Sequence, residues 1–193
     1  LLKTDGENYV IASDTDSVYL NLSKLVDQVF GERVRLPKDE GGISKERIVK
    51  FLDRVANEKL EPFIDKSYKD LADYMNAYDQ KMFMKREVIA DRGIWTAKKR
   101  YILNVHNSEG VQYDEPKLKI MGLEVVKSST PAPVRVMLKD AIKVVVNGSN
   151  DDLLEFIEQC REEFNTLPPE EIAFPRSVNG VEKYKSDIKV YTK

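Results

Sequence analysis

Two carboxylates one residue apart, Asp14 and Asp16, separate two short runs of strand-forming residues at positions 8–13 and 17–22. Because both runs are rich in Tyr, Val, Ile and Leu, and only Asp-Thr-Asp lies between them, the sequence predicts a β-hairpin with the acidic pair at its turn. Like charges held close together raise each other's pKa unless a cation neutralises them. Mg²⁺ is bound through one or two carboxylates together with phosphate oxygens. The turn therefore indicates a site for a metal ion and a phosphate.

The tripeptide alone leaves other interpretations open. Aspartate suits tight turns for backbone reasons, so an Asp-x-Asp turn can be purely structural. Glycosyltransferases also use Asp-x-Asp to hold a metal ion and a nucleotide diphosphate, although there the motif closes a βαβ unit and here a second strand follows at once. A third interpretation is a DNA-binding or clamp-interacting module in which the turn is incidental.

Composition and charge exclude several classes of protein. The formal net charge is −2, so attraction to nucleic acid must come from local clusters; basic residues gather between positions 92 and 127, and acidic residues between 150 and 171. The single cysteine, Cys160, excludes an internal disulfide and a cysteine-based zinc site. No apolar run approaches the roughly 20 residues that span a bilayer, and no signal-peptide pattern opens the chain. We expect a cytoplasmic protein without a membrane partner.

The elements around the turn predict an α+β fold. A short helix is expected from a cap at Ser23 to Gly31, and a longer helical pattern begins at Ser44. Pro62 interrupts that pattern, so we expect a kink or two helices. Further along, β-branched and aromatic runs predict two strands linked through residues 91–93, and a shorter strand at 111–113.

The last third of the chain has a helical pattern. One helix is expected to start with a cap at Ser129 or Thr130 and to stop at Asn147-Gly148, and a second to fill positions 150–166. The second is read as an amphipathic helix with a solvated acidic face, with a partner-binding role as the alternative. We place a domain boundary near residues 124–130. His106 is expected on the surface or in a hairpin, and Trp95 in packing.

Four segments in order carry a resemblance to the family B DNA polymerases. "ASDTDSVYL" resembles the signature Tyr-Gly-Asp-Thr-Asp-Ser, with Ala12-Ser13 in place of Tyr-Gly. Three further segments follow it: "KMFMKREVIA", "TAKKRYILNV" and "EPKLKIMGLEVVKSSTP". Their sequences are most similar to those of the replicative polymerases of T-even-like bacteriophages. The resemblance implies an antiparallel palm-type sheet with packed helices, followed by a helical thumb segment. Residues 1–127 would be the carboxy-terminal portion of the palm and residues 128–193 part of the thumb.

The resemblance also implies roles for individual residues. Asp14 and Asp16 would be catalytic metal ligands, with Asp16 the principal one. Glu87 would sit near the metals without being a principal ligand, and Thr15 would lie at the nucleotide. The expected DNA contacts are Lys98, Lys99, Arg100, Tyr101, Lys117, Lys119 and Lys127.

The basic cluster at Lys98, Lys99 and Arg100 is read as part of a strand. Alternate side chains of a strand face opposite sides, so the three cannot all contact one ligand. Lys99 is assigned to the minor groove by resemblance. The alternative is a solvated basic edge that guards a strand.

The implied parent enzyme is a DNA-directed DNA polymerase. It would join a dNTP to a primer 3′-hydroxyl with two Mg²⁺ ions, and its partners would be primer–template DNA, dNTP and a sliding clamp. The family's other metal-binding aspartate, its fingers and its exonuclease have no counterpart here. The chain also lacks an initiating Met and starts just before a strand. We therefore expect a piece of a longer polypeptide that works in the host cytoplasm and is inactive without the remainder.

Overall fold

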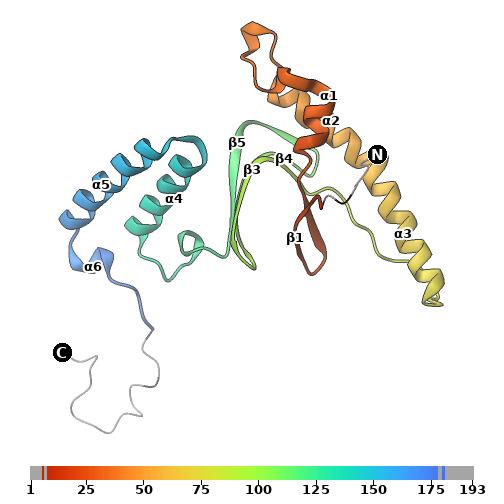
Figure 1. The fold of residues 1–193 in the computed structure, drawn as a ribbon. Helices are drawn as coiled ribbons and strands as arrows, with labels where there is room; N and C mark the ends of the chain where they lie inside the picture. The colour runs from red at the N-terminus through yellow and green to blue at the C-terminus, as the bar shows by residue number, and fades with distance from the viewer. Residues whose placement is uncertain (1–5, 7, 178–179, 181–193) are drawn as a thin grey trace. The chain divides into compact units, whose positions relative to one another are not determined.

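The computed structural model describes residues 6, 8–177 and 180. The chain divides into two compact units, Leu1–Lys119 and Ile120–Lys193, which are described separately below. Helices and antiparallel strands occur side by side in the first unit (Figure 1), so the predicted α+β class is confirmed. None of the helices in the described part of the chain is long and apolar enough to cross a bilayer.

The acidic tripeptide closes a hairpin, as the sequence predicts. Strands β1 (Val10–Asp14) and β2 (Ser17–Leu20) pair antiparallel, with Asp14 opposite Ser17. The loop is Thr15-Asp16, and Thr15 has a φ of 56°. A β-branched residue rarely takes a left-handed backbone, so the turn stores strain. A hairpin in this position also argues against the βαβ arrangement of the glycosyltransferase alternative.

Three helices follow the hairpin. Helix α1 (Ser23–Phe30) ends at Gly31, but the predicted cap is wrong because Ser23 is already the first helical residue. Its hydroxyl donates to Asn21 Oδ1 at 2.7 Å. The 3₁₀ turns η1 (Gly31–Val34) and η2 (Lys38–Glu40) lead to helix α2 (Lys45–Val55), where Ser44 accepts the capping bond from the Arg47 backbone.

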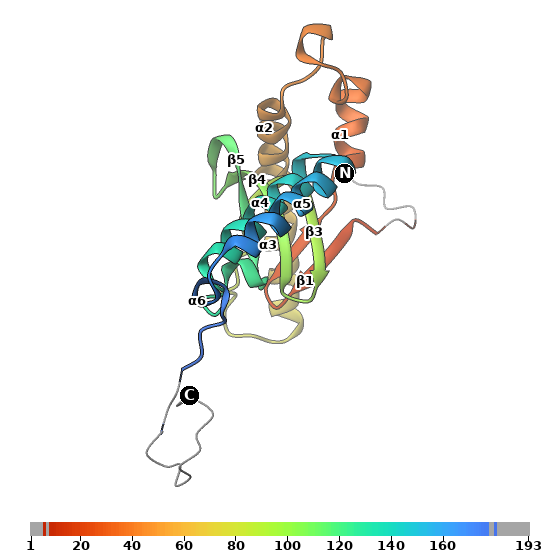
Figure 2. The ribbon, with the colours of Figure 1, turned by 90° about the vertical axis from the view of Figure 1, so that its left-hand side faces the viewer.

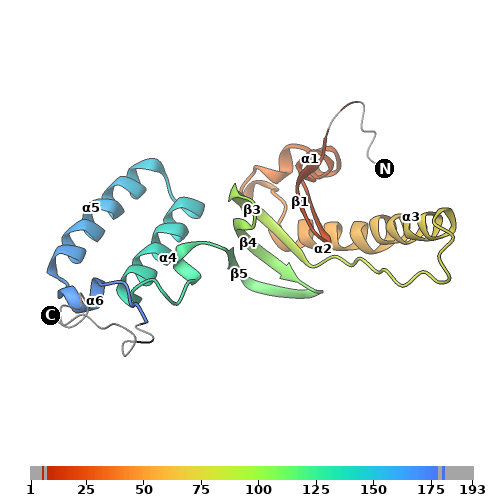
Figure 3. The same ribbon diagram turned by 90° about the horizontal axis from the view of Figure 1, so that it is seen from below.

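The interruption predicted at Pro62 is confirmed. A π-helical turn, η3 (Ala56–Leu60), separates α2 from helix α3 (Glu61–Tyr74), and Pro62 lies in the first turn of α3. Proline has no backbone N–H to donate, so it is tolerated in a first turn but not further along a helix. The three elements form one long helical rod (Figure 3), whose irregular turn ends at Leu60, just before the proline.

The second sheet has the order β3-β4-β5 and differs from the prediction in its turn. Strands β3 (Val88–Ala97) and β4 (Arg100–Ser108) pair antiparallel, and Lys98-Lys99 forms the loop. The predicted link at residues 91–93 is wrong, because those residues lie inside β3: Arg92 pairs with Asn104 and Gly93 with Leu103, and in this stretch the register shifts only between Ala90 and Arg92. Strand β5 (Val111–Met121) is also much longer than predicted.

Gly93 shows why β3 continues through the expected turn. A Cβ at this position would lie 2.6 Å from two ring carbons of Trp95 and 2.9 Å from Leu103 Cδ2. Glycine therefore serves close packing of an aromatic ring on the strand, which is a known use of glycine within sheets. The glycine that suggested a turn in the sequence is therefore explained by the packing of Trp95.

A Cβ added at position 93 should destabilise the fold. Gly93→Ala should lower the free energy of unfolding by about 1–3 kcal/mol, because the alanine forces the Trp95 ring out of place. Urea denaturation followed by far-UV circular dichroism measures the cost. In a Trp95→Phe background the smaller ring leaves room, so the same substitution should cost less. An equal cost in both backgrounds would contradict this account.

The core of the first unit is built on the central strand β4. Ile102, Leu103 and Val105 are buried, as is Ile89 on the neighbouring β3. His106 lies in this strand of the β3–β4 hairpin and is 7% exposed, so the expected hairpin position is confirmed and the surface position is wrong. A strand covered on both faces buries polar and apolar residues alike, and alternation does not reveal this.

A polar network around Asp91 joins the sheet to helix α2. The Asp91 carboxylate accepts hydrogen bonds from Lys45 Nζ at 2.7 Å and Asn104 Nδ2 at 2.8 Å. His106 Nε2 lies 3.2 Å from the same carboxylate. Burial raises the pKa of Asp91, but the bonds from Lys45 and Asn104 outweigh it, and the pKa falls below the usual 3.8.

This lowered pKa makes the network sensitive to acid. A carboxylate with a depressed pKa stabilises the fold above its unfolded-state pKa and loses that contribution as pH falls through the folded-state value. The stability gap between the wild-type chain and Asp91→Asn should therefore be constant near neutrality and shrink below pH 3.8. Urea titrations at pH 6 and pH 3 measure the gap, and a gap independent of pH would contradict the assignment.

The second unit is helical. It contains η4 (Glu124–Val126), α4 (Ala132–Asn147), α5 (Asn150–Thr166) and α6 (Pro169–Ile172). Ser149 and Asp152 form a capping box at the start of α5, and α4 stops at Gly148 as predicted. The predicted cap at Ser129 or Thr130 is wrong, because Pro131 takes that position. The buried Thr130 instead donates its hydroxyl to the Glu124 carbonyl at 2.8 Å.

Candidate functional site

Two hairpin turns of the first unit come together. The β1–β2 and β3–β4 hairpins lie side by side with their turns toward the same end (Figures 1 and 2). Lys99, from the second turn, places its Nζ 3.7 Å from Oδ1 of Asp14 in the first. Thr15 Oγ1 donates to the same Asp14 oxygen at 3.1 Å. Lys99 has a left-handed φ of 61°. Both turns thus carry a non-glycine residue in a strained backbone conformation, which is common where a site must be held in one geometry.

Three aromatic rings hold the two hairpins together. Tyr19 of β2 contacts Trp95 of β3 edge-to-face and Tyr101 of β4, with both pairs of ring centroids 5.5 Å apart. Such pairs add about 0.5–1.5 kcal/mol beyond the burial of their surface. The packing role expected for Trp95 is confirmed. The same three residues fix the distance between the acidic turn and the basic turn.

Tyr101 also lies within the electrostatic field of the acidic residues. Burial, a hydrogen bond with Tyr19 and the negative charges of Glu87 and Asp14 together raise the pKa of its hydroxyl. The phenol therefore stays protonated at neutral pH and can donate a hydrogen bond.

Glu87 occupies a second acidic position beside a lysine. Its carboxylate pairs with Lys119 of β5. Its carbonyl accepts a hydrogen bond from the Glu109 backbone N–H at 2.7 Å. The Glu87 side chain is 55% exposed. The pair is therefore accessible to a ligand.

The predicted principal metal ligand, Asp16, is exposed at the tip of its turn. Among the described residues it forms no ion pair, whereas Asp14 has Lys99 beside it. No group of three or more metal-ligating side chains gathers within the described residues. Two carboxylates of one turn match what Mg²⁺ takes from a protein when phosphate oxygens supply the rest. The donor set fits part of a metal site.

The remaining basic residues are spread over both units. Lys98 and Lys99 form a loop, so the prediction that they are consecutive strand residues with Arg100 is wrong. The strand-alternation argument against a shared ligand therefore does not apply to the two lysines. Lys117 lies 4.2 Å above the ring of Tyr113, in a cation–π contact. Lys127, in the second unit, pairs with Glu124 at 2.9 Å.

Comparison with known proteins identifies the kind of chain that carries these turns. Over 189 residues it is 40% identical to the DNA-directed DNA polymerase of Escherichia phage RB69, covering 94% of this chain and 20% of that protein. It is 34% identical to the DNA-directed DNA polymerase of Enterobacteria phage T4, with the same coverage. By sequence, the chain is related to the T-even-like family B DNA polymerases. The resemblance drawn from the four segments is thereby confirmed.

The relationship covers one part of a much longer enzyme, since the chain spans 20% of the length of both phage polymerases. No protein-family model matches the chain. Within that span, both the acidic turn and the Lys-Lys-Arg-Tyr segment lie in the first structural unit, where their tips meet.

Two residues of the first unit were not singled out from the sequence. Arg86, which is 12% exposed, binds the Asp53 carboxylate of α2 and donates to Asn107 Oδ1 at 2.7 Å. It anchors the backbone next to Glu87. Tyr19 was missed as well, although its place two residues after Ser17 in an alternating strand was a usable signal.

Proposed function

We propose that the chain is the part of a DNA-directed DNA polymerase that carries the Asp-Thr-Asp turn and contacts to primer–template DNA. Residues 1–127 would form the carboxy-terminal portion of the palm and residues 128–193 part of the thumb. The observation that carries the proposal is the contact between Asp14 and Lys99, which joins two of the segments that resemble the polymerases. The 40% identity to the RB69 enzyme supports it.

The acidic turn would hold the metal ions of the reaction. Asp16, which is exposed and free of an ion pair among the described residues, is the principal ligand in this proposal, and Asp14 the second. Glu87 would stay nearby without coordinating, and Thr15 would lie at the nucleotide. When bound, two Mg²⁺ ions would activate the primer 3′-hydroxyl and stabilise the leaving pyrophosphate. The other ligands and the fingers would come from the rest of the enzyme.

Lys99, in the turn between β3 and β4, is an ion-pair partner for Asp14 in the absence of a bound metal ion. Like-charge repulsion between Asp14 and Asp16 is relieved in part by Lys99, whose side chain is 66% exposed. An ion pair this exposed contributes only about 0–1 kcal/mol. Lys99 can therefore leave Asp14 for DNA at little cost, and Asp14 becomes available to a metal ion at the same time.

The DNA contacts would be made by Lys98, Lys99, Arg100, Tyr101, Lys117, Lys119 and Lys127. Lys119 and Lys127 also sit in exposed or half-exposed pairs with carboxylates, so phosphates can replace those partners. Contacts to phosphate position DNA without reading its sequence, which suits a replicative enzyme. For the complete enzyme we also propose a sliding clamp as a partner and the host cytoplasm as the location.

The dependence of duplex affinity on salt tests the DNA contacts. Each neutralised phosphate adds about 0.9 to the slope of log affinity against log salt. Lys99→Ala and Lys127→Ala should each weaken binding to a primer–template duplex and reduce the slope by about one. Lys143→Ala is the matched control, since Lys143 is an exposed lysine paired with Asp140 and has no proposed DNA role. If the affinity for the duplex depends neither on salt nor on either substitution, these contacts are ruled out.

A DNA-binding module without chemistry is the second candidate, and it predicts the same salt dependence. It differs from the polymerase proposal in one respect: Asp16 would then be dispensable for primer extension by the complete enzyme.

A further inference from the structure

The end of the helical rod in the first unit carries unusual apolar exposure. Helix α3 has no buried residue along its 14 residues. It extends away from the sheets, and the chain after it runs back toward β3 (Figure 3). The exposed side chains on this stretch, here called the arm surface, are Phe63, Leu71, Tyr74, Met75, Tyr78, Met82 and Phe83.

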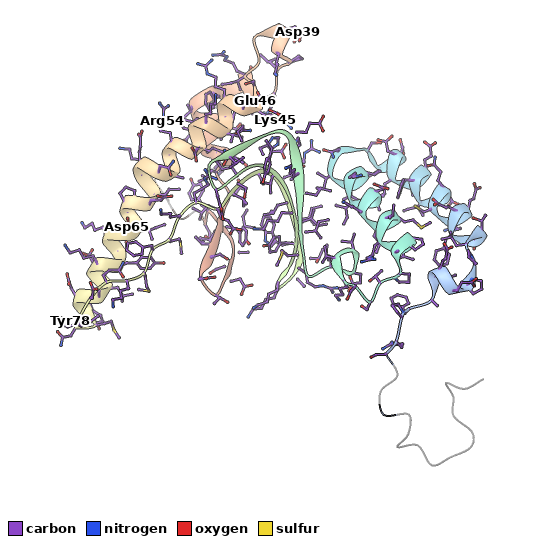
Figure 4. The ribbon with its side chains drawn as sticks, turned by 180° about the vertical axis from the view of Figure 1, so that it is seen from behind. Asp39, Lys45, Glu46, Arg54, Asp65 and Tyr78 are labelled. Carbon is purple, nitrogen blue, oxygen red and sulfur yellow. The ribbon has the colours of Figure 1, made fainter. Side chains whose placement is uncertain are left out.

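Several of these side chains are almost fully in solvent. Tyr74 is 85% exposed, Tyr78 is 105% exposed and Phe83 is 77% exposed. Tyr78 lies at the far end of the rod, beyond Asp65 (Figure 4). Scattered single apolar residues on a surface are normal, but a run of large ones marks an interaction site. Tyrosine, phenylalanine and methionine are also the residues enriched in the centres of protein interfaces.

The helix itself needs a partner for its stability. Most of the stability of a helix in a folded protein comes from packing an apolar face against a partner. Ile64, Tyr68 and Ala72, spaced four residues apart, are only half-buried on the side that faces the unit. The folded chain therefore leaves α3 with little of the packing that a helix of its length requires.

The charges around the arm surface indicate what kind of partner it fits. Between positions 65 and 85 four aspartates are balanced by four lysines: Asp65, Asp70, Asp73, Asp79, Lys66, Lys69, Lys81 and Lys85. A surface for nucleic acid needs an excess of positive charge, which this stretch lacks. Apolar aromatics with a balanced polar surround match a protein surface instead.

We propose that the arm surface is the docking site for the remainder of the polymerase polypeptide. This rests on the proposed function. The chain corresponds to 20% of its phage relatives, so in those enzymes the same stretch belongs to a chain about five times as long. That remainder supplies a protein partner in every copy of the enzyme, which a second copy of this chain does not.

The experiment mixes the complete chain with an RB69 DNA polymerase from which the matched segment has been deleted, purified separately. Sedimentation measures association, and hydrogen exchange locates it. The amides of residues 63–83 should become at least about tenfold more protected on mixing. A Tyr78→Ser and Phe83→Ser double variant should weaken association by about tenfold or more. Because both side chains are exposed, the variant should keep its fold, which circular dichroism checks.

Matched control variants distinguish binding at the arm surface from nonspecific hydrophobic association. Val136→Ser and Leu154→Ser change residues of the second unit that are 61% and 63% exposed. They should leave the association unchanged. No association, or protection elsewhere than on the arm surface, would overturn the inference. So would self-association of the chain alone that Tyr78→Ser abolishes, since the occupant would then be a second copy.

The same preparation separates this inference from the proposed function. The Tyr78→Ser and Phe83→Ser variant should bind primer–template duplex as the wild-type chain does. If the wild-type chain does not bind the duplex in a salt-dependent way, the result counts against the polymerase proposal. Intact duplex binding without arm protection would count against the docking site alone.

Discussion

Replacing Asp53 with alanine is expected to lower the free energy of unfolding by about 2–4 kcal/mol. Asp53 is the carboxylate partner of Arg86, whose side chain is 12% exposed. Arg86 Nε is already buried without a hydrogen-bond partner among the described residues. Removing Asp53 leaves a buried guanidinium whose other partners in the described part of the chain are Asn107 and the Glu87 carbonyl. An uncompensated buried charge is among the most costly changes a fold can suffer.

A surface pair supplies the control for Asp53. Asp140 and Lys143 lie 2.7 Å apart on helix α4, and their side chains are 42% and 56% exposed. Asp140→Ala should change stability by less than about 0.5 kcal/mol. Urea denaturation of both variants measures the difference. Equal small effects would show that the Arg86 pair does not hold α2 against the start of β3.

Replacing Asp16 with asparagine is expected to lower the rate of primer extension by about 10³-fold, the kinetic equivalent of losing several kcal/mol of charge stabilisation by a metal ion. The effect must be measured in a complete enzyme, such as an RB69 polymerase in which this chain replaces the matched segment. The amide keeps the size of the side chain and removes its charge. Duplex affinity should change little, because Asp16 makes no proposed contact with DNA.

Two comparisons sharpen this prediction. Asp14→Asn should reduce the rate less than Asp16→Asn, because Asp16 is the principal metal ligand in this proposal and Asp14 the second. Asp39→Asn, in the exposed η2 turn, should leave the rate unchanged. Rates that fall equally for Asp16 and Asp39, or for neither, would contradict the assignment of the metal ligands.

The sequence predicted the acidic hairpin because its signal is local. Strand-forming residues flank two turn-forming aspartates, and the pairing of Asp14 with Ser17 needs no distant partner. The start of a helix at Ser44 and the break at Pro62 were predictable for the same reason, since each depends on one residue and its neighbours.

The features that the sequence did not predict depend on distant packing. Gly93 indicated a chain break, but the ring of Trp95 fills the space that its missing Cβ leaves. His106 looked exposed until β4 proved to be the central strand. The approach of Lys99 to Asp14 joins residues far apart in the chain, and contacts among Tyr19, Trp95 and Tyr101 create it. No local pattern reports such a contact.

Primer extension by the RB69 polymerase that carries this chain in place of the matched segment tests the central claim most directly. The account predicts template-directed extension with Mg²⁺ that the same polymerase without any segment does not show, and that the isolated chain does not show either. A folded hybrid that binds primer–template DNA but adds no nucleotides would contradict the account, as would extension by the isolated chain.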